Sequence, residues 1–459
     1  MYDTLKGHLE RIRASLLREH AGIAAIEEQS ELVHRLGAMS SVETGSVERV
    51  PVGPEFAGRS LREIDYRRTR GVEVLAIQTR ERRFLCPPDP ARPLAEGDVL
   101  LVLSSWVIYP GPPREERALF RVYATMDQRM PLSRVADHAR RAEALGYDGL
   151  NVPEAVHDGL LAAGAALAAT TRLHVATSVI VAFPRSPMAV AHAAWDLQEL
   201  SGGRFLLGLG SQVRGNIVGR YSTPWSAPIP RMREYVNSLR AIFDTWQNGT
   251  ELRFEGEHYR FTRMQPFFSP GKLAKPGIPI LLGGIGPGMN ALAGEVADAL
   301  VTHPTSSAPR YLREVVLPRL AKGAARAGRE RGDCRLVVAP LVAAGASAEE
   351  LRAAREGVRR LFGFLFSTPP YWPPLELFGW KERGERLNEL SRAGQWDAMT
   401  GIVSDEMLDA FSPSGRYEEI ADVLRAWYGD LTDWITFPMP ESSARDAEVS
   451  AALRALRGA

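Results

Sequence analysis

Short apolar runs alternate with longer amphipathic segments over residues 119–440 of the chain. Between the runs, apolar side chains recur at helical spacing, as in 133–145, where Ser133 is the predicted cap and Gly146 the predicted end. This alternation is typical of β/α units around a parallel sheet. The predicted strands are Phe120–Ala124, Asp148–Val152, His174–Val181, Arg204–Gly208, Ile278–Leu282, Ala299–Thr302, Arg335–Leu341 and Trp434–Phe437.

The number of these strands bears on the fold. Eight strands are the number that closes a (β/α)8 TIM barrel, which is therefore the predicted α/β fold, and a doubly wound open sheet remains the alternative. Two stretches, 271–279 and 366–374, interrupt the alternation with Pro, Gly and aromatic residues. We expect them to be insertions in the barrel.

The first quarter of the chain has a different pattern. Apolar residues at helical spacing within 1–46 predict a helical arm, which either packs on its own domain or mediates dimerisation. Residues 47–105 contain three strand-like runs around a short helix from Leu61 to Arg68, which predicts a small α+β domain. A Pro- and Gly-containing linker, 106–118, precedes the barrel domain, 119–459.

Composition narrows the function. The 56 basic residues nearly balance the 55 acidic ones, which argues against a nucleic-acid-binding or membrane-surface protein. The two cysteines, Cys86 and Cys334, lie far apart without a CxxC partner, so neither a disulfide framework nor a metal site is expected. No signal peptide and no run of roughly 20 apolar residues occurs. We expect a cytoplasmic protein, not inserted in a membrane, that acts on a small molecule.

The small domain resembles a known regulatory module. The segment GRSLREIDYRRTRGVEVLAIQ, followed by PPDPARPLAEGDVLLVL, is similar to the C-terminal module of TrkA-type potassium-transport regulators, called RCK-C. The resemblance implies a unit that dimerises and binds a small effector such as a cyclic dinucleotide. Beside an enzyme domain, regulation and a remnant of gene fusion are both open interpretations.

The barrel segment resembles a family of oxidoreductases. The ordered motifs YDGLNVPEAVHD, TSVIVAFPRSPMAV, GGRFLLGLGSQV and IPILLGGIGPGMN are similar to those of the bacterial luciferase-like monooxygenase superfamily, closest to its coenzyme F420-dependent oxidoreductases. The resemblance implies hydride transfer between this deazaflavin and an organic substrate, in a homodimer. An FMN-dependent monooxygenase is one alternative, and a non-enzymatic, ligand-sensing regulator of cation transport is another.

Candidate catalytic residues follow the second strand. Glu154 and His157 come directly after the apolar run that ends at Val152. Loops at the carboxyl ends of barrel strands carry the chemistry in this fold. A carboxylate and an imidazole there can position a substrate or exchange a proton, so both are predicted catalytic residues, and the sequence leaves open which one moves the proton. Relatives carry a histidine directly after the acidic residue, where this chain has Ala155.

Candidate cofactor-binding residues follow three other strands. The resemblance implies a cis peptide between Ser178 and Val179, pressed against one face of the cofactor ring. Glycines elsewhere allow a cofactor to approach the backbone, and a helix N-terminus binds phosphate. The sequence GLGSQV is not a dinucleotide fingerprint, because its third glycine is replaced by Val213. The predicted contacts after the fourth and fifth strands are Gly208, Gly210, Ser211, Gly283, Gly284, Ile285 and Gly286.

A histidine after the sixth strand is a weaker candidate. His303 lies in the segment ALVTHP. A lone histidine is more often part of the packing than of a site. The sequence therefore favours a packing role for His303.

Overall fold

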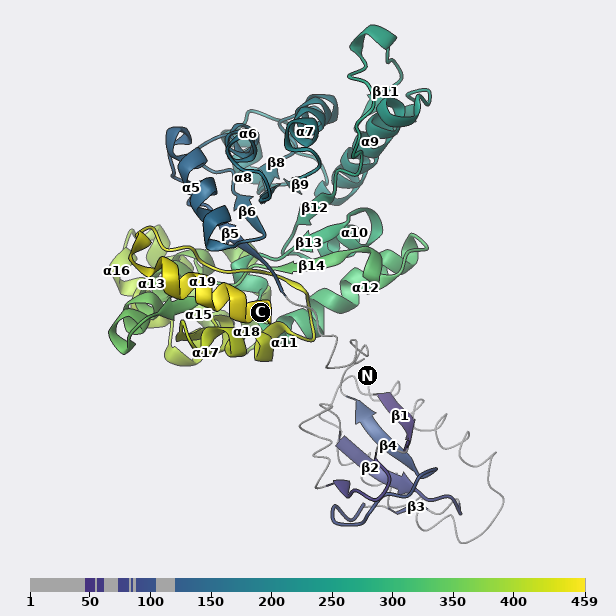
Figure 1. The fold of residues 1–459 in the computed structure, drawn as a ribbon. Coiled ribbons are helices and arrows are strands. Elements are labelled where there is room, and N and C mark those ends of the chain that lie inside the picture. Colours follow the sequence, from purple (N-terminus) through teal and green to yellow (C-terminus); the bar gives the residue numbers. More distant parts are fainter. Residues whose placement is uncertain are drawn as a thin grey trace. The chain divides into compact units, whose positions relative to one another are not determined.

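The computed structural model describes residues 46–53, 56–61, 73–81, 84–85, 88–104 and 120–458. The chain divides into two compact units, residues 1–111 and 112–459, which Figure 1 shows and which are treated separately below. The predicted helical arm before Ser46, the predicted helix beyond Leu61 and the predicted linker lie outside the described residues.

The first unit contains a four-stranded antiparallel sheet in the order β1-β4-β2-β3. The strands are β1 (Ser46–Pro51), β2 (Glu73–Gln78), β3 (Phe84–Leu85) and β4 (Val99–Ser104). β2 and β3 pair antiparallel, and Arg80 and Glu81 lie in a turn after β2. Val52, Ile77, Leu94 and Leu100 form its small buried core.

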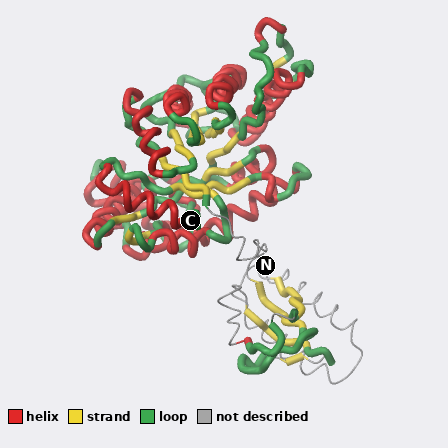
Figure 2. The backbone as a smooth tube through the Cα atoms, viewed as in Figure 1, coloured by secondary structure: helices red, strands yellow, loops and turns green. Residues whose placement is uncertain are grey.

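The second unit contains a closed parallel barrel. Its strand order is β12-β13-β14-β17-β5-β6-β7-β9-β8, and pairing of β12 with β9 closes the ring. Figure 2 shows these strands in yellow inside a layer of red helices. The strands are β5 (Arg121–Thr125), β6 (Gly149–Val152), β7 (His174–Thr177), β8 (Ile180–Val181), β9 (Phe205–Gly210), β12 (Ile280–Gly283), β13 (Ala299–Val301), β14 (Arg335–Val338) and β17 (Trp434–Thr436).

The eight predicted strands are confirmed, but the third, fourth and seventh differ from their predicted form. The seventh ends at Val338, three residues before its predicted end. The third is split into β7 and β8 around residues 178 and 179. The fourth continues to Gly210, two residues beyond its predicted end, and is buried throughout. Gly208 and Gly210 therefore lie within a strand and not in a loop.

Helices connect successive strands on the outside of the barrel. They include α5 (Leu132–Leu145), α6 (Gly159–Ala169), α7 (Pro187–Ser201), α8 (Arg214–Gly219), α9 (Pro228–Asn248), α10 (Pro287–Val296), α12 (Leu317–Arg326) and α19 (Asp446–Leu456). α5 ends at Gly146 in the left-handed conformation (φ 98°), as predicted. The prediction that Ser133 caps α5 is wrong, because Pro131 occupies the N-cap position. Proline is compatible with this position, since the first helical N–H groups lack intrahelical partners.

Helical segments also extend the barrel between β14 and β17. They include α13 (Ala348–Phe366), η6 (Pro369–Tyr371), α14 (Pro373–Leu377), α15 (Lys381–Arg392), α16 (Trp396–Met399), α17 (Asp405–Phe411) and α18 (Ile420–Tyr428). The predicted insertion at 366–374 is a small part of this larger one. Tyr371, the last residue of η6, stacks on His303, so this segment reaches the loop after β13.

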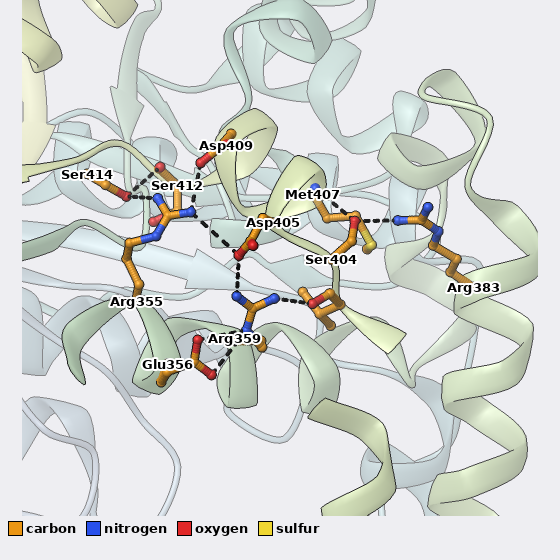
Figure 3. A network of polar contacts seen from close by, with 11 residues as sticks. Arg355, Glu356, Arg359, Arg383, Ser404, Asp405, Met407, Asp409, Ser412 and Ser414 are labelled. Atoms are coloured by element: carbon orange, nitrogen blue, oxygen red, sulfur yellow. Dashed lines mark hydrogen bonds and ion pairs between the residues drawn. The ribbon is translucent and has the colours of Figure 1, made fainter. Parts of the chain in front are cut away.

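A polar network joins two of these helices (Figure 3). Arg359 on α13 donates to Oδ1 of Asp405, at the start of α17, at 2.5 Å and to the carbonyl of Val403. Arg355, one turn earlier, donates to Asp409 at 2.8 Å. The side chains of both arginines are mostly buried, so these contacts hold α17 against α13.

No helix among the described residues is both long and apolar enough to span a bilayer. The described residues also contain no cluster of His, Cys, Asp and Glu side chains arranged to hold a metal ion.

Candidate active site

The candidate site residues lie at the carboxyl ends of β6, β7, β9, β12 and β13, either in the loops that follow these strands or, for Gly208, Gly210 and Gly283, in the last residues of the strands themselves. Because the barrel strands are parallel, these loops share one face of the barrel. The fold thus brings the candidate residues, dispersed from 154 to 303 in the sequence, to one rim.

Glu154 lies in a cluster of charged residues at this rim. Its side chain is only 6% exposed, and its Oε1 lies 2.5 Å from a guanidinium nitrogen of Arg185. Its Oε2 accepts from another nitrogen of Arg185 at 2.9 Å and from the backbone N–H of Val181 at 2.6 Å. The buried carboxylate therefore has an ionic partner and several donors, which is what burial of a charge requires.

Asp158 completes this cluster. It accepts from Arg185 at 2.7 Å and caps α6 by accepting from the backbone N–H groups of Leu160 and Leu161. Burial raises the pKa of the Asp158 carboxyl, but the hydrogen bonds from Leu161 and Arg185 outweigh burial and hold it below its ordinary value. Arg185 thus neutralises two carboxylates and fixes the loop after β6 against the loop after β8.

His157 lies in the same loop and is exposed. Glu154, by contrast, is fixed by Arg185, so it fits the positioning of neighbouring groups better than free exchange of a proton. The catalytic roles of both residues remain predictions.

The peptide between Ser178 and Val179 is cis, as the family resemblance implies. The side chain of Val179 faces three of the predicted glycines. A β-carbon on Gly210 would lie 2.6 Å from Val179 Cγ2, and one on Gly283 would lie 3.1 Å from Val179 Cγ1. A β-carbon on Gly208 would lie 1.9 Å from the carbonyl oxygen of Thr177.

These contacts give the glycines a packing role. Gly208, Gly210 and Gly283 admit Val179 and the backbone at Thr177, so close approach of a cofactor is not needed to explain them. Thr177 also links β7 to β9 by hydrogen bonds. Its hydroxyl donates to the carbonyl of Gly208 and accepts from the N–H of Gly208. Ser178, Val179 and Ser211 are partly exposed, and their cofactor contacts remain predictions.

The loop of residues 283–286 combines packing with open space. A β-carbon on Gly284 would meet Met289 at 2.4 Å, whereas one on Gly286 would meet nothing within 4 Å. Gly286 is the N-cap of α10, and no side chain caps this helix. Asn290, in the first turn, is 1% exposed, and both polar atoms of its amide lack hydrogen-bond partners in the described structure.

An anionic group fits this loop. The first N–H groups of a helix have no intrahelical partners and favour negative charge. The partly exposed loop also includes Ile285, and the amide oxygen of Asn290 is 3.7 Å from the β-carbon position of Gly284. An uncapped helix start beside an unpartnered buried amide suits a phosphate, which would accept from both.

His303 is a further polar group at this rim. Its ring lies 4.5 Å from that of Tyr371, and its Nδ1 accepts from the backbone N–H of Thr305 at 3.4 Å and contacts the Thr305 hydroxyl at 2.8 Å. Burial lowers the pKa of His303 to about 4. At neutral pH the ring is therefore uncharged, and with Nδ1 accepting, its Nε2 carries the proton. Packing against Tyr371 agrees with the role that the sequence favours.

This burial predicts a pH-dependent stability. Because the folded-state pKa of His303, about 4, is below its ordinary 6.5, the unfolded chain binds more protons between these values, and stability falls as pH drops from 6.5 to 4. We expect His303→Asn to reduce that slope by up to roughly 1.4 kcal/mol per pH unit. Urea unfolding at several pH values measures it. The curves of variant and wild type should run parallel above pH 6.5, and parallel curves down to pH 4 would contradict the prediction.

Two residues of this site were not predicted from the sequence. Arg185, in FPRSP after β8, is the partner of Glu154, and Asn290 lies behind the glycine loop. Arg185 carries a signal in hindsight, because an arginine beyond the next strand end can reach a carboxylate at a neighbouring one. Asn290 carries no such signal in the sequence, because its burial depends on how α10 packs.

Comparison with known proteins identifies a family for each unit of the chain. Residues 117–433 match the family model of the luciferase-like monooxygenases, and residues 47–106 match that of the TrkA-C domain. An uncharacterized protein of Mycobacterium tuberculosis is 44% identical over 294 residues, which are 64% of this chain and 86% of that protein.

Two further similarities concern proteins that use coenzyme F420. An F420-dependent glucose-6-phosphate dehydrogenase of Nakamurella multipartita is 32% identical over 208 residues, 43% of this chain and 59% of that protein. Among solved structures, the coenzyme F420 dependent tetrahydromethanopterin reductase from Methanopyrus kandleri superposes with a TM-score of 0.62 at 18% identity, covering 74% of this chain and 98% of that one. The structural match shows the shared barrel fold.

Proposed function

Because the chain belongs to the luciferase-like monooxygenase family, we propose that it is an oxidoreductase that uses coenzyme F420 to transfer a hydride to or from a small organic substrate. The observation that carries this proposal is the loop of residues 283–286, where an uncapped helix start and the unpartnered amide of Asn290 suit the phosphate of a cofactor tail. The F420-dependent relatives support the choice of cofactor.

When bound, F420 would supply the deazaflavin ring that accepts or donates the hydride. The chain's own residues would bind and orient it. Gly286 and the first turn of α10 would hold the phosphate, and the backbone around Ser178, Val179 and Ser211 would face the ring. Glu154, fixed by Arg185, would position the neighbouring loop, and the neutral ring of His303 would offer an N–H donor at the rim.

The FMN-dependent monooxygenase is the alternative, since members of the same fold bind FMN. Parallel titrations with F420 and FMN distinguish the two, because the deazaflavin absorbs at shorter wavelength and reacts poorly with oxygen. We expect saturable binding of F420 with at least about tenfold preference over FMN, a difference of roughly 1.4 kcal/mol. Preferred binding of FMN, with oxygen consumption upon reduction, would replace the proposal by the monooxygenase.

The phosphate contact has its own test. Gly286 has ordinary backbone angles (φ −75°, ψ 151°) and open space, so a side chain fits there. Asp and Ser both cap helices well, but only Asp brings a negative charge. We expect Gly286→Asp to weaken F420 binding by about tenfold or more, while Gly286→Ser stays within a few-fold of wild type. Equal affinities of the two variants for F420 would contradict the proposed phosphate contact at this loop.

We also infer that the four parts predicted from the sequence, 1–46, 47–105, 106–118 and 119–459, act as arm, regulatory module, linker and enzyme. The TrkA-C match supports the second part. Such a module would sense a small effector in a cytoplasmic homodimer. Titration of the full chain with a cyclic dinucleotide tests it, and a protein that binds this effector but neither F420 nor FMN would be a regulator and not an enzyme.

A further inference from the structure

A cavity lies at the face of the barrel where the strands begin, opposite the face that carries the candidate active site. It has a volume of about 470 Å³ and lies within the second unit. Its walls come from the starts of β5, β6 and β7, from the loops before β6 and β7, and from the C-terminal end of the chain. The lining residues are Arg121, Tyr123, Glu143, Gly146, Tyr147, Asp148, Arg172, His174 and Arg457.

The two carboxylates of this cavity already have donors. Asp148 accepts from the guanidinium group of Arg457 at 2.8 Å and from the backbone N–H of Val122 at 2.9 Å. Oε1 of Glu143 accepts from three successive backbone N–H groups, those of residues 171–173. These acids are therefore committed to the fold and leave little capacity to neutralise further cations.

Of the three arginines of the cavity, only Arg457 pairs with a carboxylate among the described residues. Arg121 and Arg172 are exposed, and within the described part of the chain their guanidinium groups make no hydrogen bond or ion pair with the protein. The Nε atom of Arg457 is buried and also lacks a hydrogen-bond partner there. Water can satisfy the donors of the two exposed arginines, so the observation that points to an anion is the gathering of three guanidinium groups around one cavity, beside the unpartnered Nε of Arg457.

Tyr123 forms the floor of the cavity. It is 2% exposed, and its hydroxyl has no hydrogen-bond partner among the residues that the structure describes. A β-carbon on Gly149 would lie 2.3 Å from the Tyr123 ring, so the glycine is what allows the ring to lie across β6. Trp434 packs against the ring with centroids 4.8 Å apart. The hydroxyl is thus a fixed, unpartnered polar group beneath the arginines.

We propose that this cavity binds a small polyanion, of the phosphate-ester or polycarboxylate kind, through Arg121, Arg172, Arg457 and the Tyr123 hydroxyl. The planar guanidinium groups match the oxygens of both anion classes, and the hydroxyl supplies a further donor. Because the cavity surrounds the beginnings of the strands, it is separate from the candidate active site at their carboxyl ends. It is an effector site of the barrel that does not depend on the cofactor proposed above.

The pKa of His174, which lines the cavity, is the quantity that anion binding should change. Burial lowers its pKa, and the nearby guanidinium groups of Arg121 and Arg204 lower it further, against opposing contributions from Asp148. A bound anion would offset these positive charges and raise the pKa.

The test uses the full chain, with histidine ring resonances followed by NMR and assigned with His174→Gln. Pyrophosphate and citrate are titrated separately, against sodium chloride at matched ionic strength. We expect a saturable rise in the His174 pKa with at least one of the two anions, and the tighter one identifies the ligand class. In Arg121→Gln/Arg172→Gln, binding should weaken by about tenfold or more, as calorimetry also measures.

Arg140→Gln is the matched control, because Arg140 is an exposed arginine of α5 whose one ion-pair partner among the described residues is exposed Asp137. It should bind the anion as wild type does. The backbone N–H groups of Arg121 and Arg172 keep their acceptors in the double variant, so its fold should be retained. A response that sodium chloride reproduces, or that persists in the double variant, would overturn the proposal.

Discussion

Gly208→Ala should destabilise the barrel by more than about 3 kcal/mol, beyond the usual range for overpacking. The added β-carbon would lie 1.9 Å from the carbonyl oxygen of Thr177, within a wholly buried strand. That oxygen belongs to the backbone, so relief requires moving β7 or β9 and not merely a side chain. Urea unfolding, or the yield of folded protein if the variant does not fold, measures the effect.

Two further variants make this result interpretable. Gly215→Ala is the control, because a β-carbon at this helical position meets nothing within 4 Å and should change stability little. Gly210→Ala is the milder variant, since its β-carbon would meet the Val179 side chain at 2.6 Å. Val179→Ala should restore part of the stability lost in Gly210→Ala. Wild-type stability of Gly208→Ala, or no rescue by Val179→Ala, would contradict the packing role of these glycines.

Arg185→Met should also cause a large loss of stability, about 3 kcal/mol or more. It removes the ionic partner of Glu154, whose side chain is 6% exposed, and leaves a buried carboxylate without a compensating charge. Glu154→Gln in the Arg185→Met background should recover part of the loss, because the amide is neutral. Equilibrium unfolding of the single and double variants measures both effects.

An exposed ion pair provides the comparison. On α5, Nη1 of Arg140 lies 2.6 Å from Oδ1 of Asp137, and both side chains are mostly exposed. Such pairs contribute little, so Arg140→Met should change the free energy of unfolding by no more than about 1 kcal/mol. If Arg185→Met were as mild as Arg140→Met, Glu154 would not depend on Arg185 for its burial.

The order of strands and helices was predictable because it depends on local pattern. Each apolar run has the length of a strand, and each intervening segment has helical periodicity, so eight units could be counted without knowing any contact. The helical extension at 348–428 was not counted, because its amphipathic segments interrupt the β/α alternation without adding barrel strands. The end of β9 was missed for a related reason. The sequence GLG looks like a turn, whereas its glycines are needed inside the strand to admit the Thr177 backbone and Val179.

The sequence by itself predicted the eight β/α units, the small α+β domain, and the strand ends near which Glu154, Gly283 and Gly286 lie. Only the tertiary structure decided what these residues contact. It pairs Glu154 with Arg185, places Val179 against three glycines, and leaves the amide of Asn290 and the donors of Arg121 without partners in the described chain. The physical reason is that strand and helix propensities act between near neighbours in the sequence, whereas burial and ion pairing depend on side chains that only closure of the barrel brings together.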